Sequence, residues 1–300
     1  MNYLPRPEGP QPEDFKLSRR AAVGSMFFTG YAAYALGAEA QPITTPEDGL
    51  TISEVVIPNG EAKGLPAYVA RPSAPGKYPA VIVVNEIFGI HAYIKDVARR
   101  WARQGYVAIA PDYFHRAGDP SQLTDYADIR KIVAQARHEQ VMGDTETTLK
   151  WVSAQGFTRK GKHGITGFCW GGTVVWMAAA RFPQIGAGAA FYGRLVPPAP
   201  PQPGQPVTAE PNRPYPVDVA KDLKAPVLGL YGGKDKGIPL DSVEAMRAAL
   251  KAAGKTDSEI IVYPDADHGF HADYRPTYKA DDAADAWKRS TEWFKKHLKA

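Results

Sequence analysis

The segment HGITGFCWGG, residues 163–172, decides how this 300-residue chain folds. It opens with a short segment, 163–166, that we expect to form a strand, and leads into an uncharged stretch, 173–180, that favours a helix. Glycines lie two positions to either side of Cys169, which is the spacing of a nucleophile elbow. This tight strand-to-helix turn lifts the central side chain above the sheet, and a thiol at a helix N-terminus is favoured as the thiolate.

Cys169 is the one cysteine in the chain, so an internal disulfide and a multi-thiolate metal site are both excluded. A small buried core cysteine is the structural alternative. The flanking glycines and the strand-to-helix context favour the nucleophile.

The composition of the whole chain is typical of a folded domain. Hydrophobic residues make up 44% of the chain and aromatic residues 11%, which is enough for a substantial core and excludes disorder as the overall state. The net charge of +4 comes from 36 basic and 32 acidic residues of mixed distribution, so we expect no nucleic-acid partner. With no internal repeat or mid-chain linker, residues 41–300 are expected to form a single domain.

Short apolar runs alternate with longer amphipathic stretches, which predicts an α/β fold with a mostly parallel central sheet and helices on both faces. An apolar stripe through Ile94, Val97 and Trp101 predicts a helix that leaves Arg99 and Arg100 facing outward. The final helix has its own stripe, which includes Ala283, Trp287, Phe294 and Leu298. The expected strands are Glu54–Ile57, Ala67–Ala70, Ala80–Val84, Val107–Ala110, His163–Thr166, Ala187–Phe191, Val227–Tyr231 and Glu259–Tyr263.

A nucleophile elbow predicts an acid and then a histidine further along the chain. Asp235 follows one expected strand and His268 follows the next, so we expect a Cys169–His268–Asp235 triad. Asp241 and Asp267 are alternatives for the acid.

His271 is the alternative for the histidine, and the glycine after His268 favours the first of the two. A metal site formed by Asp265, Asp267, His268 and His271 would need a carboxylate-histidine motif that the segment lacks, so no metal is expected.

The first buried strand ends in Asn85-Glu86-Ile87-Phe88-Gly89. An oxyanion hole in such a fold uses the backbone N–H after the nucleophile, here Trp170, and one from this loop, for which we predict Ile87. Glu86 would then lie in the site, where its carboxylate could take the thiol proton; a surface loop acid is the alternative.

The first 40 residues differ from the rest of the chain. Ser18-Arg19-Arg20 precedes an uncharged segment, 21–38, and Ala38-Glu39-Ala40 offers a small-residue cleavage site, as in a twin-arginine export signal. We therefore expect cleavage after Ala40, a periplasmic location and no lasting membrane partner. An uncleaved anchor or a plain tail, with a cytoplasmic location if the signal does not function, is the alternative.

One segment interrupts the α/β pattern. Leu195–Tyr215 contains eight prolines, which exclude helix and central strand and predict an extended surface loop. It is either a tolerated insertion or a flap beside the site.

Four separated motifs, namely Gly167–Gly172, Asn85–Gly89, Asp235 and His268–Phe270, together resemble the dienelactone hydrolase family from about residue 50 to the end. The resemblance implies an α/β-hydrolase fold, a cysteine-histidine-aspartate triad and cofactor-free hydrolysis of an ester or lactone, typically an enol-lactone such as carboxymethylenebutenolide. It also implies that Glu86 pairs with the cysteine and takes its proton when substrate binds.

The resemblance implies arginines that bind the carboxylate of dienelactone. Arg116 is a match by position, whereas Arg275 lies further beyond the histidine than the family pattern has it. We include Tyr192 with them as a substrate-binding candidate and expect a monomer that acts on a small molecule. A general carboxylesterase acting on neutral or xenobiotic esters, and a non-catalytic binding protein with the same fold, are the alternatives.

Overall fold

A computed structural model describes residues 42–198, 210 and 212–298 of the chain. The expected export signal, 1–40, lies outside these residues, as does the middle of the expected proline-rich loop. In the part of the chain that is described, no helix is both long and apolar enough to span a bilayer.

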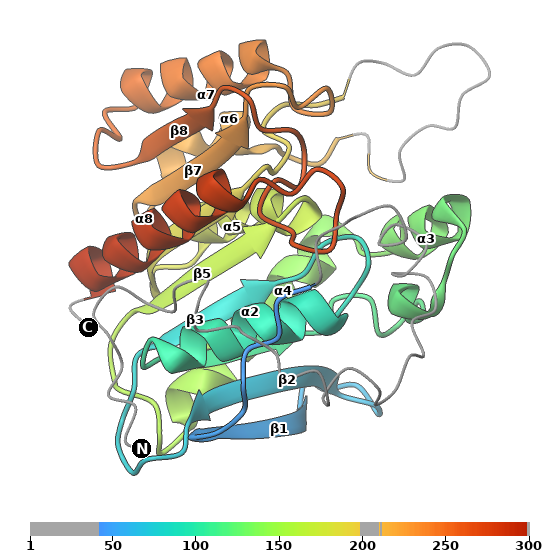
Figure 1. The fold of residues 1–300 in the computed structure, drawn as a ribbon, viewed down its shortest axis with the longest axis vertical. Helices are drawn as coiled ribbons and strands as arrows, with labels where there is room; N and C mark the ends of the chain where they lie inside the picture. Colours follow the sequence, from blue (N-terminus) through green and yellow to red (C-terminus); the bar gives the residue numbers. More distant parts are fainter. Residues whose placement is uncertain (1–41, 199–209, 211, 299–300) are drawn as a thin grey trace.

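Within the described residues, eight strands form one mixed sheet in the order β1-β2-β4-β3-β5-β6-β7-β8. The first two pairings, β1 with β2 and β2 with β4, are antiparallel, and all the others are parallel (Figure 1). The strands are β1 (Leu50–Ile57), β2 (Leu65–Pro72), β3 (Ala80–Val84), β4 (Val107–Pro111), β5 (His163–Phe168), β6 (Ile185–Phe191), β7 (Val227–Gly232) and β8 (Glu259–Tyr263).

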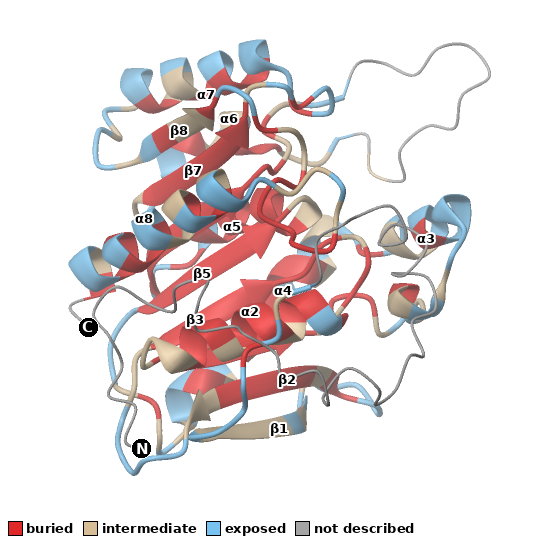
Figure 2. Cartoon of the chain, viewed as in Figure 1, coloured by how far each residue is buried: buried red, intermediate tan, exposed pale blue. Residues whose placement is uncertain are grey.

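Strand β3 shows why the sheet needs cover on both sides. All five of its residues are buried, and successive side chains point to opposite faces. Val81 and Val83 pack on one face, whereas Ile82 and Val84 pack on the other, so each face has its own apolar core (Figure 2).

The helices divide between these two faces. Helices α2 (Ala92–Arg103) and α8 (Ala280–Leu298) cover the face that contains Val81 and Val83. Helices α4 (His138–Ala154), α5 (Trp170–Arg181) and α7 (Leu240–Ala252) cover the other. The described part also contains α3 (Tyr126–Val133) and the short α6 (Pro216–Val219).

The predicted fold class is confirmed, and each of the eight expected strands is present with ends that differ by a few residues at most. One expectation about the face of a helix is wrong. Arg100 on α2 does not face solvent but is buried, because two carboxylates from different parts of the chain surround its guanidinium.

Candidate active site

The turn between β5 and α5 holds Cys169 in a strained conformation. Its φ is +56°, a value that side chains other than glycine rarely adopt. A Cβ on Gly167 would lie 2.4 Å from a backbone oxygen of α5, and a Cβ on Gly171 would lie 2.6 Å from the carbonyls at the end of β3. Both glycines are therefore required by close backbone approach, and the turn presents Cys169 at the N-terminus of the helix.

His268 connects Cys169 to Asp235. The His268 Nδ1 atom lies 2.7 Å from Asp235 Oδ2, and the Cys169 side chain is near enough to His268 for the two to interact electrostatically. Asp235 is buried, and its other oxygen accepts backbone N–H bonds from Gly237 and Ile238 at 2.8 and 3.0 Å. These bonds fix the carboxylate, which in turn fixes the orientation of the imidazole.

The alternative acids and the alternative histidine occupy other positions. Asp241 is exposed in the first turn of α7, and Asp267 is half-buried. His271 is buried, and its Nδ1 lies 2.6 Å from the Tyr93 hydroxyl. Burial lowers the pKa of His271 to about 3, with the Arg100 charge acting in the same direction, so His271 is neutral.

The charge state of His268 follows from these contacts. Burial acts to lower the pKa of His268, but the Cys169 charge and the hydrogen bonds to Asp235 and Cys169 outweigh it and raise the pKa to about 10. The His268 imidazole is therefore protonated at neutral pH.

The raised pKa predicts a pH dependence of stability. A histidine with a pKa of about 6.5 when unfolded and about 10 when folded binds its proton more tightly in the folded state. The stabilisation that protonated His268 gives to the folded state is fully present below pH 6.5 and is lost as the pH rises through 10. We expect the free energy of unfolding, measured in urea from pH 6 to 10.5, to fall across this window in the wild type.

His268→Asn is the control, because it removes the titrating group and keeps a polar side chain. A wild-type slope equal to that of His268→Asn across the window would contradict the assigned ion pair.

Glu86 lies in the loop after β3, and its side chain is wholly buried. The Tyr274 hydroxyl donates to Oε2 at 2.6 Å, Arg275 Nη2 lies 3.4 Å from Oε1, and His91 Nε2 lies 3.5 Å from Oε2. Burial alone would raise the pKa of Glu86, but Arg275, His91 and Tyr274 lower it to about 2. The carboxylate is therefore ionised and held by three side chains.

The two backbone N–H groups expected to form an oxyanion hole belong to Ile87 and Trp170. Val84 of β3 pairs with Gly167 of β5, so Ile87 and Trp170, each three residues further on, leave the same edge of the sheet on neighbouring strands. Trp170 is the first residue of α5, where a helix leaves the N–H without an intrahelical acceptor. Among the described residues, no acceptor is found for the Ile87 N–H.

Tyr192 follows β6 and lies against His268. It is buried at a φ of +37°, and its ring packs edge-on against the His268 imidazole at 5.1 Å between centroids. Within the described part of the chain, its hydroxyl has no hydrogen-bond partner. Burial raises the pKa of Tyr192 well above the usual value, so this hydroxyl remains a proton donor.

The two arginines proposed for substrate binding have different surroundings. Arg275 is mostly buried, and its charge interacts with both Glu86 and Cys169. Arg116 instead binds Asp144 through two hydrogen bonds of 2.7 and 2.8 Å, and its Nε donates to Glu61. The structure thus gives Arg116 two carboxylates of the protein itself, which does not fit the expectation that it binds a substrate carboxylate.

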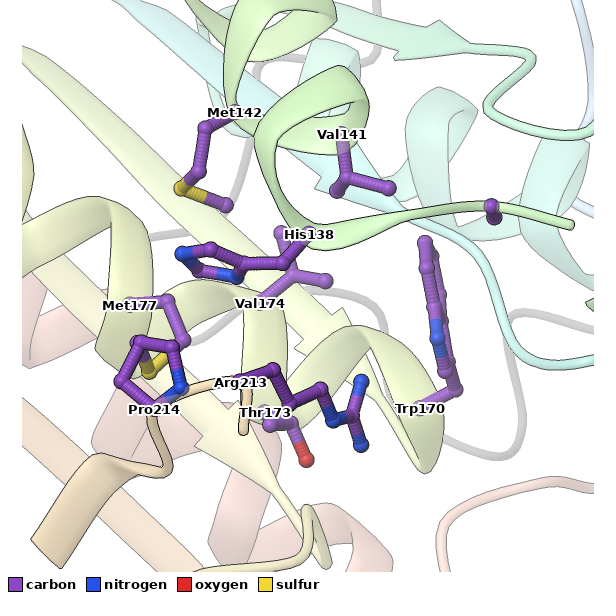
Figure 3. A pocket seen from close by; sticks show the side chains of 10 residues that line it. His138, Val141, Met142, Trp170, Thr173, Val174, Met177, Arg213 and Pro214 are labelled. Carbon is purple, nitrogen blue, oxygen red and sulfur yellow. The ribbon is translucent and has the colours of Figure 1, made fainter. Parts of the chain in front are cut away.

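A small hollow between α4 and α5 has Trp170 in its lining (Figure 3). Met142, Val174 and Met177 form its apolar wall, and Arg213 lies near its edge. Its free volume of about 20 Å³ holds about one water molecule. In this conformation it cannot take a substrate group.

Sequence reasoning missed the side chains that hold Glu86, apart from Arg275. His91 and Tyr274 are 5 and 188 residues from Glu86 along the chain, and no local motif connects the three. Across the residues that the structure describes, no group of three His, Cys, Asp or Glu side chains could hold a metal ion.

A mostly parallel sheet covered by helices on both faces, with a tight turn and a helix after its central strand, defines the α/β-hydrolase class. Residues 65–298 match the sequence pattern of the dienelactone hydrolase family. A Methylorubrum extorquens protein described as "Putative carboxymethylenebutenolidase" is 45% identical over 283 residues, which cover 94% of each chain. An Escherichia coli K12 protein with the same description is 45% identical over 271 residues, covering 90% of this chain and 96% of its own.

A solved structure agrees with these relatives. The crystal structure of "Putative Dienelactone Hydrolase from Klebsiella pneumoniae" is 44% identical, covers 83% of this chain and 99% of its own, and superposes with a TM-score of 0.75. The chain belongs to the dienelactone hydrolase family, and it is accordingly a hydrolase of a lactone or an ester.

Proposed function

We propose that this hydrolase cleaves a carboxylic ester or lactone through a covalent thioester on Cys169, with His268 and Asp235 completing a catalytic triad. One observation carries the proposal. The strained turn presents Cys169 at a helix N-terminus, and its charge acts on a histidine that a buried aspartate orients.

In the first half of the reaction, the Cys169 thiolate attacks the carbonyl carbon. The carbonyl oxygen becomes an oxyanion, which the N–H groups of Ile87 and Trp170 stabilise. As the tetrahedral intermediate collapses, the bond to the leaving oxygen breaks, and that oxygen takes the proton of His268. A thioester on Cys169 and a neutral imidazole remain.

In the second half, water adds to the thioester carbon and gives its proton to His268. The carbon–sulfur bond breaks, which releases the carboxylic acid and restores the thiolate beside the imidazolium. Asp235 holds Nδ1 throughout, so that Nε2 exchanges the proton. No cofactor enters this sequence.

Glu86 has a distinct part in this proposal. To take the thiol proton, its carboxylate would have to leave Arg275 and Tyr274. We assign it instead to neutralising Arg275, whose charge also acts on Cys169.

The substrate class can be tested through Arg116. The engagement of this residue by Asp144 and Glu61 favours a second candidate, a carboxylesterase for neutral esters that needs no anion clamp. We expect Arg116→Ala to change kcat/KM by about 3-fold or less, and equally for dienelactone and for a neutral aryl ester, because an exposed or engaged charge contributes little to catalysis. Steady-state hydrolysis of both esters measures this.

The two esters serve as controls for each other. A loss above tenfold on dienelactone alone would show that Arg116 leaves its carboxylates and binds the substrate. Turnover of the neutral ester alone by the wild type would support the second candidate, and failure to turn over either ester would favour a binding protein. Export, a periplasmic location and a monomeric state stay predictions.

A further inference from the structure

The segment directly before β1 crosses α2 on its way into the sheet (Figure 1). We call residues 42–48 the strap. Thr45, at its centre, is buried although its neighbours are exposed. Its N–H donates to Asp96 on α2, and its carbonyl accepts from Arg99 at 3.0 Å. Arg103 donates to the carbonyl of the next residue at 3.0 Å, so α2 holds the strap by its backbone.

Beneath the strap lies a buried charge cluster. Arg100 Nε donates to Asp96 at 2.6 Å, and Arg100 Nη2 donates to Asp273. The two aspartates are 1–2% exposed and the arginine 8% exposed. Burial raises the pKa of Asp273 to about 6, and the Arg100 charge acts against this rise. The strap thus contacts Asp96, and Arg100 connects Asp96 to Asp273.

Asp273 belongs to the loop that carries the catalytic groups. It directly precedes Tyr274 and Arg275, which hold Glu86. It lies five residues after His268, and the loop is closed on itself by hydrogen bonds. The Thr277 hydroxyl donates to the His268 carbonyl at 2.8 Å. Three backbone N–H groups also donate to carbonyls of the same loop at 2.9 Å: Ala272 to Gly269, Arg275 to Ala272 and Lys279 to Phe270.

We propose that the strap and Asp273 are positioning elements of the active site: through Asp96, Arg100 and Asp273 they fix the loop that presents His268 to Cys169 and Arg275 to Glu86. The inference rests on the proposed function for its catalytic consequence. Because the loop is closed on itself, a shift at Asp273 moves His268, and a displacement of about 1 Å can cost about 10²-fold in rate.

The test uses the full chain with Thr45→Pro, which removes the N–H bonded to Asp96. Thr45→Ala is the matched control, because it keeps that N–H and removes a hydroxyl without a hydrogen bond. We expect Thr45→Pro to lower kcat for ester hydrolysis about tenfold or more with little change in KM, and Thr45→Ala to behave as the wild type. Asp273→Asn, which keeps the shape and removes the charge, is expected to match Thr45→Pro.

Two further measurements separate positioning from simple stabilisation. The rate of Cys169 alkylation by iodoacetamide, followed against pH, is expected to reach its half-point at higher pH in Thr45→Pro and Asp273→Asn, because the imidazolium no longer lies against the thiolate. The Thr45→Pro/Asp273→Asn double variant is expected to have a kcat no lower than that of the less active single variant, since both changes act through one cluster.

An unchanged kcat and an unchanged alkylation profile in a folded Thr45→Pro variant would overturn the inference. A lower melting temperature of this variant would not rescue the inference if kcat and the alkylation profile are unchanged. If Thr45→Pro does not fold, Asp273→Asn decides by the same criteria. Alkylation needs no turnover. A shifted profile in a protein that hydrolyses no ester would therefore refute the proposed function and leave the positioning role intact.

Discussion

Cys169→Ala is expected to reduce ester hydrolysis by about 10³-fold or more, because removing the nucleophile of a triad leaves only binding and oxyanion stabilisation. The change is small, and alanine meets the same backbone strain as cysteine at the φ of +56°. Hydrolysis of a neutral aryl ester under steady-state conditions measures the loss, and circular dichroism confirms the fold.

Cys169→Ser is the informative companion. It keeps a hydroxyl beside His268, but a serine hydroxyl ionises much less readily than a thiol and does not supply the anionic nucleophile of the proposed mechanism. We expect residual activity between those of the wild type and the alanine variant. An alanine variant within tenfold of the wild type would exclude Cys169 as the nucleophile.

Glu86→Ala is expected to destabilise the protein by about 3–5 kcal/mol, because it leaves the buried Arg275 charge without its carboxylate. The Tyr274 hydroxyl loses its acceptor at the same time. Urea unfolding at pH 7 measures the change in free energy. Glu86→Gln, which keeps an acceptor for Tyr274, is expected to lose less.

Glu54→Ala is the matched control, since its carboxylate pairs with Lys95 at 2.8 Å but is 74% exposed. An exposed pair of this kind contributes about 0.5 kcal/mol. Equal unfolding energies for Glu86→Ala and Glu54→Ala would show that the Glu86 carboxylate is not the counter-charge that Arg275 requires.

Much of the sheet and the core of the site could be predicted because their signals are local. β-branched runs predict the strands, and the glycines around Cys169 predict the turn. The order of Asp235 and His268 follows from the same fold, because each lies on a loop directly after a strand.

The surroundings of Glu86 and Arg100 could not be predicted in the same way. Tyr274 is 188 residues from Glu86, and Asp273 is 173 residues from Arg100, so only the folded chain brings them together. A prediction from the apolar stripe of a helix places every charged residue outside the stripe in solvent. For this reason Arg100 was expected to face outward. The one available signal was Asp96, four residues earlier, a spacing that pairs opposite charges on a helix.

The groups that we propose take part in the reaction, Glu86, Cys169, Asp235 and His268, follow β3, β5, β7 and β8, whereas the side chains of the strands pack into the two cores. This separation makes the protein modular. Loops at the edge can change length and composition without altering strand register, so new substrate ranges can evolve, or be engineered by loop exchange, while the reacting groups stay in place.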